Sequence, residues 1–463
     1  MSLSLRKLAL LSAMLLSNAA IASGVSLPAY EQFTLDNGTR VMLMEKHDVP
    51  LVSMHIRIAG GSLLDEPGKN GSLALLAEMM QKGAGSRDAS GFADAIDNVG
   101  GNLDIGNDRE SLQLSAQFMS ADTGLMVALA ADALLRPQLK PAEFAKARER
   151  AIQTIIGNKD SDPRALTGIY GESWLFRGHP YGQPVDGDET TLAAVELVDL
   201  VNLRSKLGAD NAFIAVVGSF KSAEMKKLLQ NGFGQWPKAQ GKLPDVAVKV
   251  PEQGRRVLLI DKPGATQSYF WLGNVGVTRL DPNLAAQNVA NTVFGGRLTS
   301  MINTELRIKS GLSDGASSRI TRYRQPGAIA ISSFTQTDST GKAIDLALET
   351  LDRLHKDGIE PAMRDSAVNY VLGQYPPNLE TGPSLASKLT ELGLYGLTRD
   401  DVDGYAARIS AVDASQLRQA IANYPTRASM AIVIIGDAGK LRETAKQYGP
   451  VTEMAITDPR YSP

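Results

Sequence analysis

The sequence predicts an α+β protein built from two similar halves. Short apolar strands and amphipathic helices follow one another along the chain, and a stretch without periodicity near the middle separates two segments in which the order of elements recurs. An apolar strand that ends in glycine closes each half, at residues 212–218 and 430–436. Each copy is far longer than the repeat of a solenoid protein. We therefore expect two homologous α+β domains.

The first half begins with a predicted hairpin. Asn37-Gly38 lies between two alternating stretches, residues 31–35 and 39–44, and this dipeptide favours a tight hairpin turn. Residues 52–58 also alternate between apolar and polar side chains and predict a third strand. The other elements expected in this half are helices at 72–82, 90–99, 121–135, 141–156 and 197–206, and strands at 102–107, 111–118 and 211–218.

The break between the halves is expected at residues 236–255, a stretch with several prolines and lysines and little periodicity. The first domain would then span residues 28–235 and the second residues 256–455. The elements expected in the second domain are strands at 256–261, 268–273, 327–335 and 429–436, and helices at 283–294, 341–356, 361–372 and 417–422.

Composition narrows the functional classes. The chain has 463 residues and a formal net charge of -2, so neither a nucleic-acid surface nor an anionic-membrane surface is indicated. Residues 1–22 carry a short basic region, an apolar run and a small-residue cleavage site, which predict a cleaved secretory signal. No later stretch is long and apolar enough to predict a membrane span. The predicted signal makes a bacterial periplasm the expected compartment, with secretion to the medium as the alternative. The chain contains no cysteine, so its stability in that oxidising compartment would not depend on disulfides.

The helix expected at 72–82 carries the most informative motif. Its framing residues Gly71, Met79, Lys82 and Gly83 match the pattern Gly-x-x-His-x-x-Glu-His-Met-x-x-Lys-Gly. This pattern resembles the zinc-binding helix of the pitrilysin/insulinase metallopeptidases, whose inverted motif supplies two histidine ligands and a general base.

The residues that would carry the chemistry are replaced. Ala74 and Glu78 stand where the family has its two histidines, and Ala77 stands where it has the general-base glutamate. The third ligand of the family, a glutamate further along the chain, would fall at Thr154 or Ile155. A catalytic zinc site needs three protein ligands, so the resemblance implies a helix kept without its metal, and we expect no metal and no cofactor in this chain.

The second half contains a stretch, residues 294–312, that resembles the Gly-rich turn and helix of the family's C-terminal domain. The resemblance implies that Arg307 reaches substrate across a closed chamber, since a guanidinium can donate to a peptide carbonyl. The tyrosine that accompanies this arginine in the family is replaced by Asp314, and Tyr323 is a possible substitute. The alternative for Arg307 is an ordinary surface or capping arginine.

Two further segments resemble the family. Residues 178–184 match its Gly-His-Pro-Tyr-Gly-x-Pro loop, where we expect His179 to be structural. Arg109-Glu110 resembles a pair found between two strands of the family, with an ordinary solvated turn as the alternative.

Family members of this length often form pairs in which one subunit keeps the zinc motif and the other has lost it. The first hypothesis is therefore a non-catalytic subunit of a periplasmic heterodimeric metallopeptidase. It would form half of a clamshell-like chamber around a peptide or unfolded protein, with zinc in the partner. The second hypothesis is a stand-alone peptide-binding or scaffold protein. The third, least favoured, is that the chain is itself a metallopeptidase.

Overall fold

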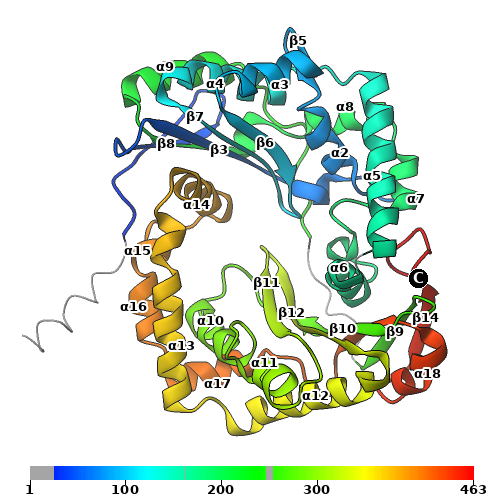
Figure 1. Cartoon of the computed structure of the whole chain (residues 1–463). Helices are drawn as coiled ribbons and strands as arrows, with labels where there is room; N and C mark the ends of the chain where they lie inside the picture. Colours follow the sequence, from blue (N-terminus) through cyan, green and yellow to red (C-terminus); the bar gives the residue numbers. More distant parts are fainter. Residues whose placement is uncertain (1–25, 162, 247–253) are drawn as a thin grey trace, which may run out of the picture.

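The computed structural model describes residues 26–161, 163–246 and 254–463. The predicted signal, residues 1–22, and part of the predicted linker lie outside these residues. Figure 1 shows two sheets that face each other across a central space, each with helices on its outer side. The predicted α+β class is confirmed, whereas the exact domain limits stay a prediction.

Within the described residues both sheets have six strands. The first sheet runs β1(Glu31–Thr34), β2(Arg40–Glu45), β8(Ala212–Gly218), β3(Leu51–Ala59), β7(Ser111–Met119) and β6(Asn102–Asn107). The second runs β11(Ala316–Arg322), β12(Pro326–Gln336), β10(Gln267–Val275), β13(Ala431–Gly436), β9(Arg256–Asp261) and β14(Val451–Ala455). Five strands of each sheet correspond when the second sheet is followed from its last strand to its first: β2, β8, β3, β7 and β6 match β9, β13, β10, β12 and β11.

The pairing directions match as well. In each sheet the strand that closes the half, β8 or β13, lies parallel to one neighbour and antiparallel to the other. The sheets differ in the sixth strand, because β1 pairs antiparallel with β2 whereas β14 comes from the end of the chain and pairs parallel with β9. The recurrence predicted from the sequence is therefore present in the topology.

Helices connect the strands and cover the sheets. Those of the first half are α2(Ser72–Met79), α3(Ala89–Asp97), α4(Thr123–Leu135), α5(Pro141–Ser161), α6(Pro163–Leu175), α7(Glu189–Ala194), α8(Leu197–Ser205) and α9(Ser222–Phe233). Those of the second are α10(Leu284–Phe294), α11(Met301–Asn303), the π-helical turn η5(Thr304–Lys309), α12(Thr340–Asp357), α13(Pro361–Gln374), α14(Gly382–Tyr395), α15(Asp400–Asp403), α16(Tyr405–Ser410), α17(Ala414–Ala422) and α18(Ala438–Lys446). In the described part of the chain, no helix combines the length and apolarity that a membrane crossing needs.

The two halves exchange one helix each. Helix α14 of the second half packs on β3 and β8 of the first sheet, and helix α6 of the first half packs on β10 and β13 of the second (Figure 1). A glycine allows each close approach: a Cβ on Gly393 would lie 2.2 Å from the Phe213 ring, and one on Gly171 would lie 2.4 Å from the Trp271 indole. Both contacts are part of buried apolar clusters. The inner face of each sheet is therefore partly buried by a helix from the other half.

Candidate functional site

Helix α2 is fixed at its first turn by a half-buried carboxylate. Asp65 accepts hydrogen bonds from the backbone N–H groups of Gly71 and Leu73, both at 2.9 Å. Burial raises the pKa of Asp65 to about 7. Gly71 has a left-handed φ of 91°, and a Cβ there would lie 2.7 Å from the Asp186 carbonyl oxygen. The framing glycine of the motif is thus required by the backbone, with or without a metal.

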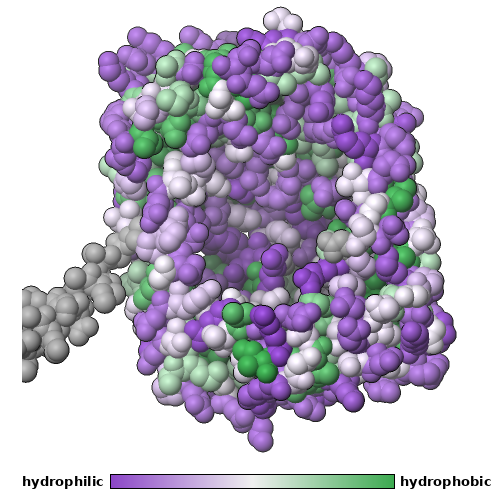
Figure 2. Space-filling view, in the orientation of Figure 1, coloured by the Kyte–Doolittle hydropathy of each residue, from purple (hydrophilic) through white to green (hydrophobic). Residues whose placement is uncertain are grey.

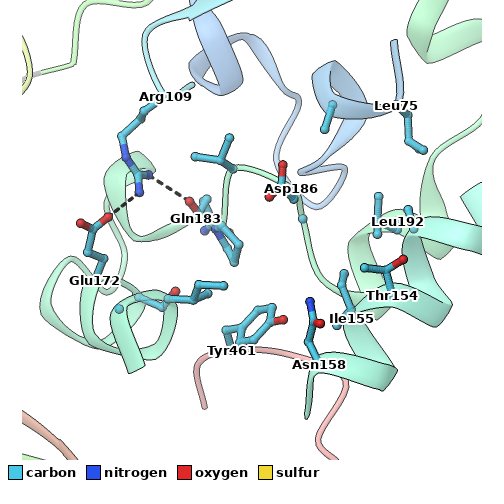
Figure 3. Close-up of a pocket in the computed structure, with 18 of the residues that line it drawn as sticks. Leu75, Arg109, Thr154, Ile155, Asn158, Glu172, Gln183, Asp186, Leu192 and Tyr461 are labelled. Carbon is cyan, nitrogen blue, oxygen red and sulfur yellow. Dashed lines mark hydrogen bonds and ion pairs between the residues drawn. The ribbon is translucent and has the colours of Figure 1, made fainter. Parts of the chain in front are cut away.

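A cavity of about 600 Å³ lies between α2, α5, α6 and the loop at residues 183–187 (Figure 3). Ala74, Glu78, Thr154 and Ile155 all line it. Ala77 instead is buried in the hydrophobic core, 2% exposed. The structure therefore brings four of the five degenerate positions to one wall.

An ion pair occupies this wall. The Arg150 guanidinium, one turn before Thr154 on α5, pairs with the Glu78 carboxylate. The Thr154 hydroxyl donates to the Arg150 carbonyl oxygen at 2.8 Å, so its polar group is satisfied within its own helix. A guanidinium thus supplies positive charge beside the carboxylate that replaces a histidine.

The residues at this wall do not fit zinc. Methyl and hydroxyl groups stand at two of the three ligand positions, and the single carboxylate, Glu78, is paired with Arg150. Across the residues that the structure describes, no group of three or more His, Cys, Asp or Glu side chains could hold a metal ion. Catalytic zinc requires three such ligands.

The four histidines make contacts away from this wall. His55 is buried on β3, where its Nδ1 lies 2.7 Å from the Thr390 hydroxyl. Burial, followed by the charge of Arg57, lowers the pKa of His55 to about 3, which keeps the ring neutral. His179 accepts from the Tyr181 N–H at 3.0 Å and shapes its loop, as expected. His47 is exposed, and His355 bonds a backbone carbonyl.

Arg109 and Glu110 are buried, so the solvated-turn alternative is wrong. Arg109 donates to Glu172 and to the Gln183 carbonyl oxygen, both at 2.9 Å (Figure 3), and its guanidinium lies 5.4 Å from the Tyr323 ring centroid. This arginine therefore ties the loop at residues 183–187 to α6.

Glu110 joins the two halves. Its carboxylate accepts from the Tyr181 hydroxyl and the Tyr395 hydroxyl, each at 2.8 Å, and from the Arg324 backbone N–H at 2.9 and 3.0 Å. Burial, more than the nearby carboxylate, raises the pKa of both tyrosines, so each phenol stays protonated and donates.

A second cavity of about 730 Å³ lies over the inner face of the second sheet, between β10–β12 and α6. Arg307 lines it, whereas Tyr323 lines the first cavity, so the substitution suggested from the sequence does not bring this tyrosine to the arginine's cavity. Both cavities include Ala165, Gly168 and Glu172 of α6 in their walls. Figure 2 shows the surface hollowed in this central region, between the two sheets.

Two family models match most of this structure. Residues 40–189 match the insulinase family (peptidase family M16), and residues 204–371 match the peptidase M16 inactive domain. The chain belongs to peptidase family M16. This family assignment confirms the resemblance seen in the motif at residues 71–83.

Relatives within family M16 carry differing names. An uncharacterized zinc protease of Mycobacterium leprae is 25% identical over 77% of this chain and 80% of its own length. The non-peptidase homolog YmxG of Helicobacter pylori is 22% identical over 74% and 78%. The crystal structure of a peptidase M16 inactive domain from Pseudomonas fluorescens superposes with a TM-score of 0.81 and 21% identity, covering 88% of this chain and 98% of that one. This likeness shows the two-domain M16 fold.

Sequence reasoning missed two features of the site. Arg150 was not singled out, because its ion pair with Glu78 joins two helices and depends on how α2 and α5 cross. The cation-rich lining of the second cavity was also missed, because its members come from four separate segments.

Proposed function

We propose that this M16 chain is a non-catalytic subunit of a periplasmic heterodimeric zinc metallopeptidase. The observation that carries the proposal is the wall of the first cavity, where the helix, the capping carboxylate and the framing Gly71 remain but Ala74 and Thr154 offer no ligand. A scaffold that is kept while its metal donors are lost favours a role in which shape and binding matter.

Three supporting observations concern the partner and the compartment. The chain has two cavities that meet at α6, which suits a chamber wall that holds an extended peptide. Its relative in Helicobacter pylori is named a non-peptidase homolog, which supports a role without peptidase activity for this chain as well. The basic and apolar pattern of residues 1–22 supports export to the periplasm.

In this proposal the chain's own residues bind and orient substrate. Arg307, exposed on the π-helical turn η5, would donate to a peptide carbonyl in the shared chamber. The cavity walls would keep the peptide extended and exclude bulk water. The hydrolytic zinc would be held by the partner subunit.

The experiment is co-expression with a family M16 protein that carries an intact His-x-x-Glu-His motif, encoded beside this chain. We expect a stable complex with chelator-sensitive peptidase activity that falls at least tenfold on Arg307→Ala, an effect of about 1.4 kcal/mol. Arg418→Ala, an exposed arginine on α17, is the matched control. A chain that never associates and still binds peptides would instead indicate the stand-alone binding protein, and stoichiometric zinc with activity in the isolated chain would indicate a peptidase.

A further inference from the structure

The second cavity is lined by four arginines, Arg164, Arg297, Arg307 and Arg319, which we call the arginine cluster. They come from α6, the loop before α11, η5 and β11, so the fold gathers them from four places. Arg164, Arg307 and Arg319 are exposed to the cavity. Like charges gathered in one concave wall repel each other, and an anionic ligand would relieve that repulsion.

The arginine cluster has no carboxylate partner among the described residues. Arg164 lies 3.7 Å from the Phe334 ring centroid, and Arg297 donates to the carbonyl and hydroxyl oxygens of Ser366. The one acidic side chain that lines this cavity is Glu172, and it is paired with Arg109 at 2.9 Å. The positive charge of the cluster is therefore left for a ligand.

This charge is local. The chain as a whole has a net charge of -2, and the first cavity is lined by Arg109 and Arg150 together with three carboxylates, those of Glu78, Glu172 and Asp186. Close to Arg307, the Glu305 carboxylate is already paired with Lys309 and Arg353. The arrangement thus leaves Arg307 unneutralised on a π-helical turn, a geometry that is common at functional sites.

The floor of the cavity suits an extended chain. Ala328, Ala330 and Ser332 of β12 line it, and these small side chains leave room above the sheet. Beside them lies β11, the edge strand of the sheet, which pairs only with β12 among the described residues. Part of its outer edge is already bonded, because the Ala316 and Ser318 N–H groups donate to Asn303 Oδ1 and to the Gly295 carbonyl oxygen. A peptide in this cavity would therefore be held mainly by side chains.

We propose that the second cavity binds a carboxylate-bearing peptide segment, with the arginine cluster pairing to its carboxylates. The carboxylates are either acidic side chains or a free C-terminus, and both suit the planar fork of arginine. The proposal rests on the proposed function only in taking a peptide as ligand. It requires no partner subunit.

The test uses the purified full chain alone and three fluorescent peptides of equal length. The first is rich in glutamate and amidated at its C-terminus, the second is neutral with a free C-terminus, and the third is rich in lysine and amidated. Anisotropy should show binding of at least one of the first two, weakening as salt rises, and no binding of the third. The first and second peptides distinguish side-chain from terminal carboxylates.

The variant R164Q/R307Q/R319Q should weaken that binding by about 10- to 100-fold, because each exposed pair contributes modestly and three are lost. The charge-matched control, K227Q/R418Q/K440Q, changes three exposed cations elsewhere and should bind like the original chain. The variant R164K/R307K/R319K keeps the charge but loses the planar fork, so its affinity should lie between those of the original chain and the glutamine variant. Thermal unfolding checks that every variant is folded.

Three results would overturn the proposal: absence of binding by both carboxylate peptides, equal loss in the cluster variant and its control, or equal affinity for the lysine peptide. A single-stranded oligonucleotide that binds as tightly, and through the same arginines, would replace it with a general polyanion site. A chain that binds the acidic peptide but finds no partner would refute only the proposed function, and a working heterodimer without this binding would refute only the present inference.

Discussion

Glu110 should be the most sensitive single carboxylate in the structure. Glu110→Ala removes the acceptor of three donors: the buried Tyr181 hydroxyl, the half-buried Tyr395 hydroxyl and the Arg324 backbone N–H. An unsatisfied buried donor costs about 1–3 kcal/mol. Because only the Tyr181 side chain is fully buried and water can reach the other two donors, we expect the free energy of unfolding to fall by about 2–4 kcal/mol.

Urea denaturation followed by circular dichroism measures this change, and the midpoint should move with little change in slope. Glu110→Gln keeps one carbonyl acceptor and should lose less, about 1–2 kcal/mol. Glu380→Ala removes an exposed carboxylate and should change stability by less than about 0.5 kcal/mol. If Glu110→Ala were no more destabilising than Glu380→Ala, the assignment of Glu110 as the joint between the halves would be refuted.

Three further outcomes are expected. Gly171→Ala should lower stability by about 1–3 kcal/mol, measured by thermal or urea unfolding, because the new methyl group meets an indole at 2.4 Å. Between pH 7.5 and pH 5 the original chain should lose about 2 kcal/mol of stability relative to His55→Gln, because the unfolded histidine takes up a proton below its ordinary pKa near 6.5 while the buried ring, with a pKa of about 3, does not. The comparison is needed because Asp65, whose pKa is raised to about 7, stabilises the folded chain as pH falls through the same range. The variant A74H/E78H/T154E should gain about one zinc per chain by metal analysis, since these positions line one wall.

Helix α6 also offers a control for Gly171→Ala, because a Cβ on Gly168 of the same helix meets nothing within 4 Å. Gly168→Ala should be neutral or slightly stabilising, since alanine favours the helix. If both glycine variants behaved alike, the close packing of α6 would not explain the loss. For the zinc variant, a metal content no higher than that of the original chain would show that α2 and α5 no longer place these three positions at the distances that zinc ligands need.

Much of the fold could be predicted from periodicity, but the two exchanged helices could not. The segments of α6 and α14 each begin near a proline and contain glycines that weaken local helix propensity. Two of them, Gly171 and Gly393, are explained by close approach to Trp271 and Phe213, aromatic residues of the other half. Glycine is therefore needed at these positions because of tertiary packing, which the local sequence pattern does not reveal.

The candidate site divides in the same way. Matching to the family motif predicted that Ala74, Glu78 and Thr154 belong together, and they share one cavity. The ion pair with Arg150 depends on how α2 and α5 cross, which spacing along the chain does not give. Tyr323 was offered as a substitute for the tyrosine that Asp314 replaces, with no sequence pattern to place it, and the structure places it in the wall of the other cavity.

The exchanged helices have a consequence for biosynthesis. The inner face of the first sheet stays uncovered until α14 has been synthesised, and α14 leaves the ribosome only after most of the second half. The hydrogen bond between His55 and Thr390 likewise spans 335 positions of the chain. Contacts so distant along the polypeptide form slowly, and the uncovered strands are prone to aggregate in the interval. We therefore expect nascent chains of this protein to depend on chaperones until nearly the whole polypeptide has emerged.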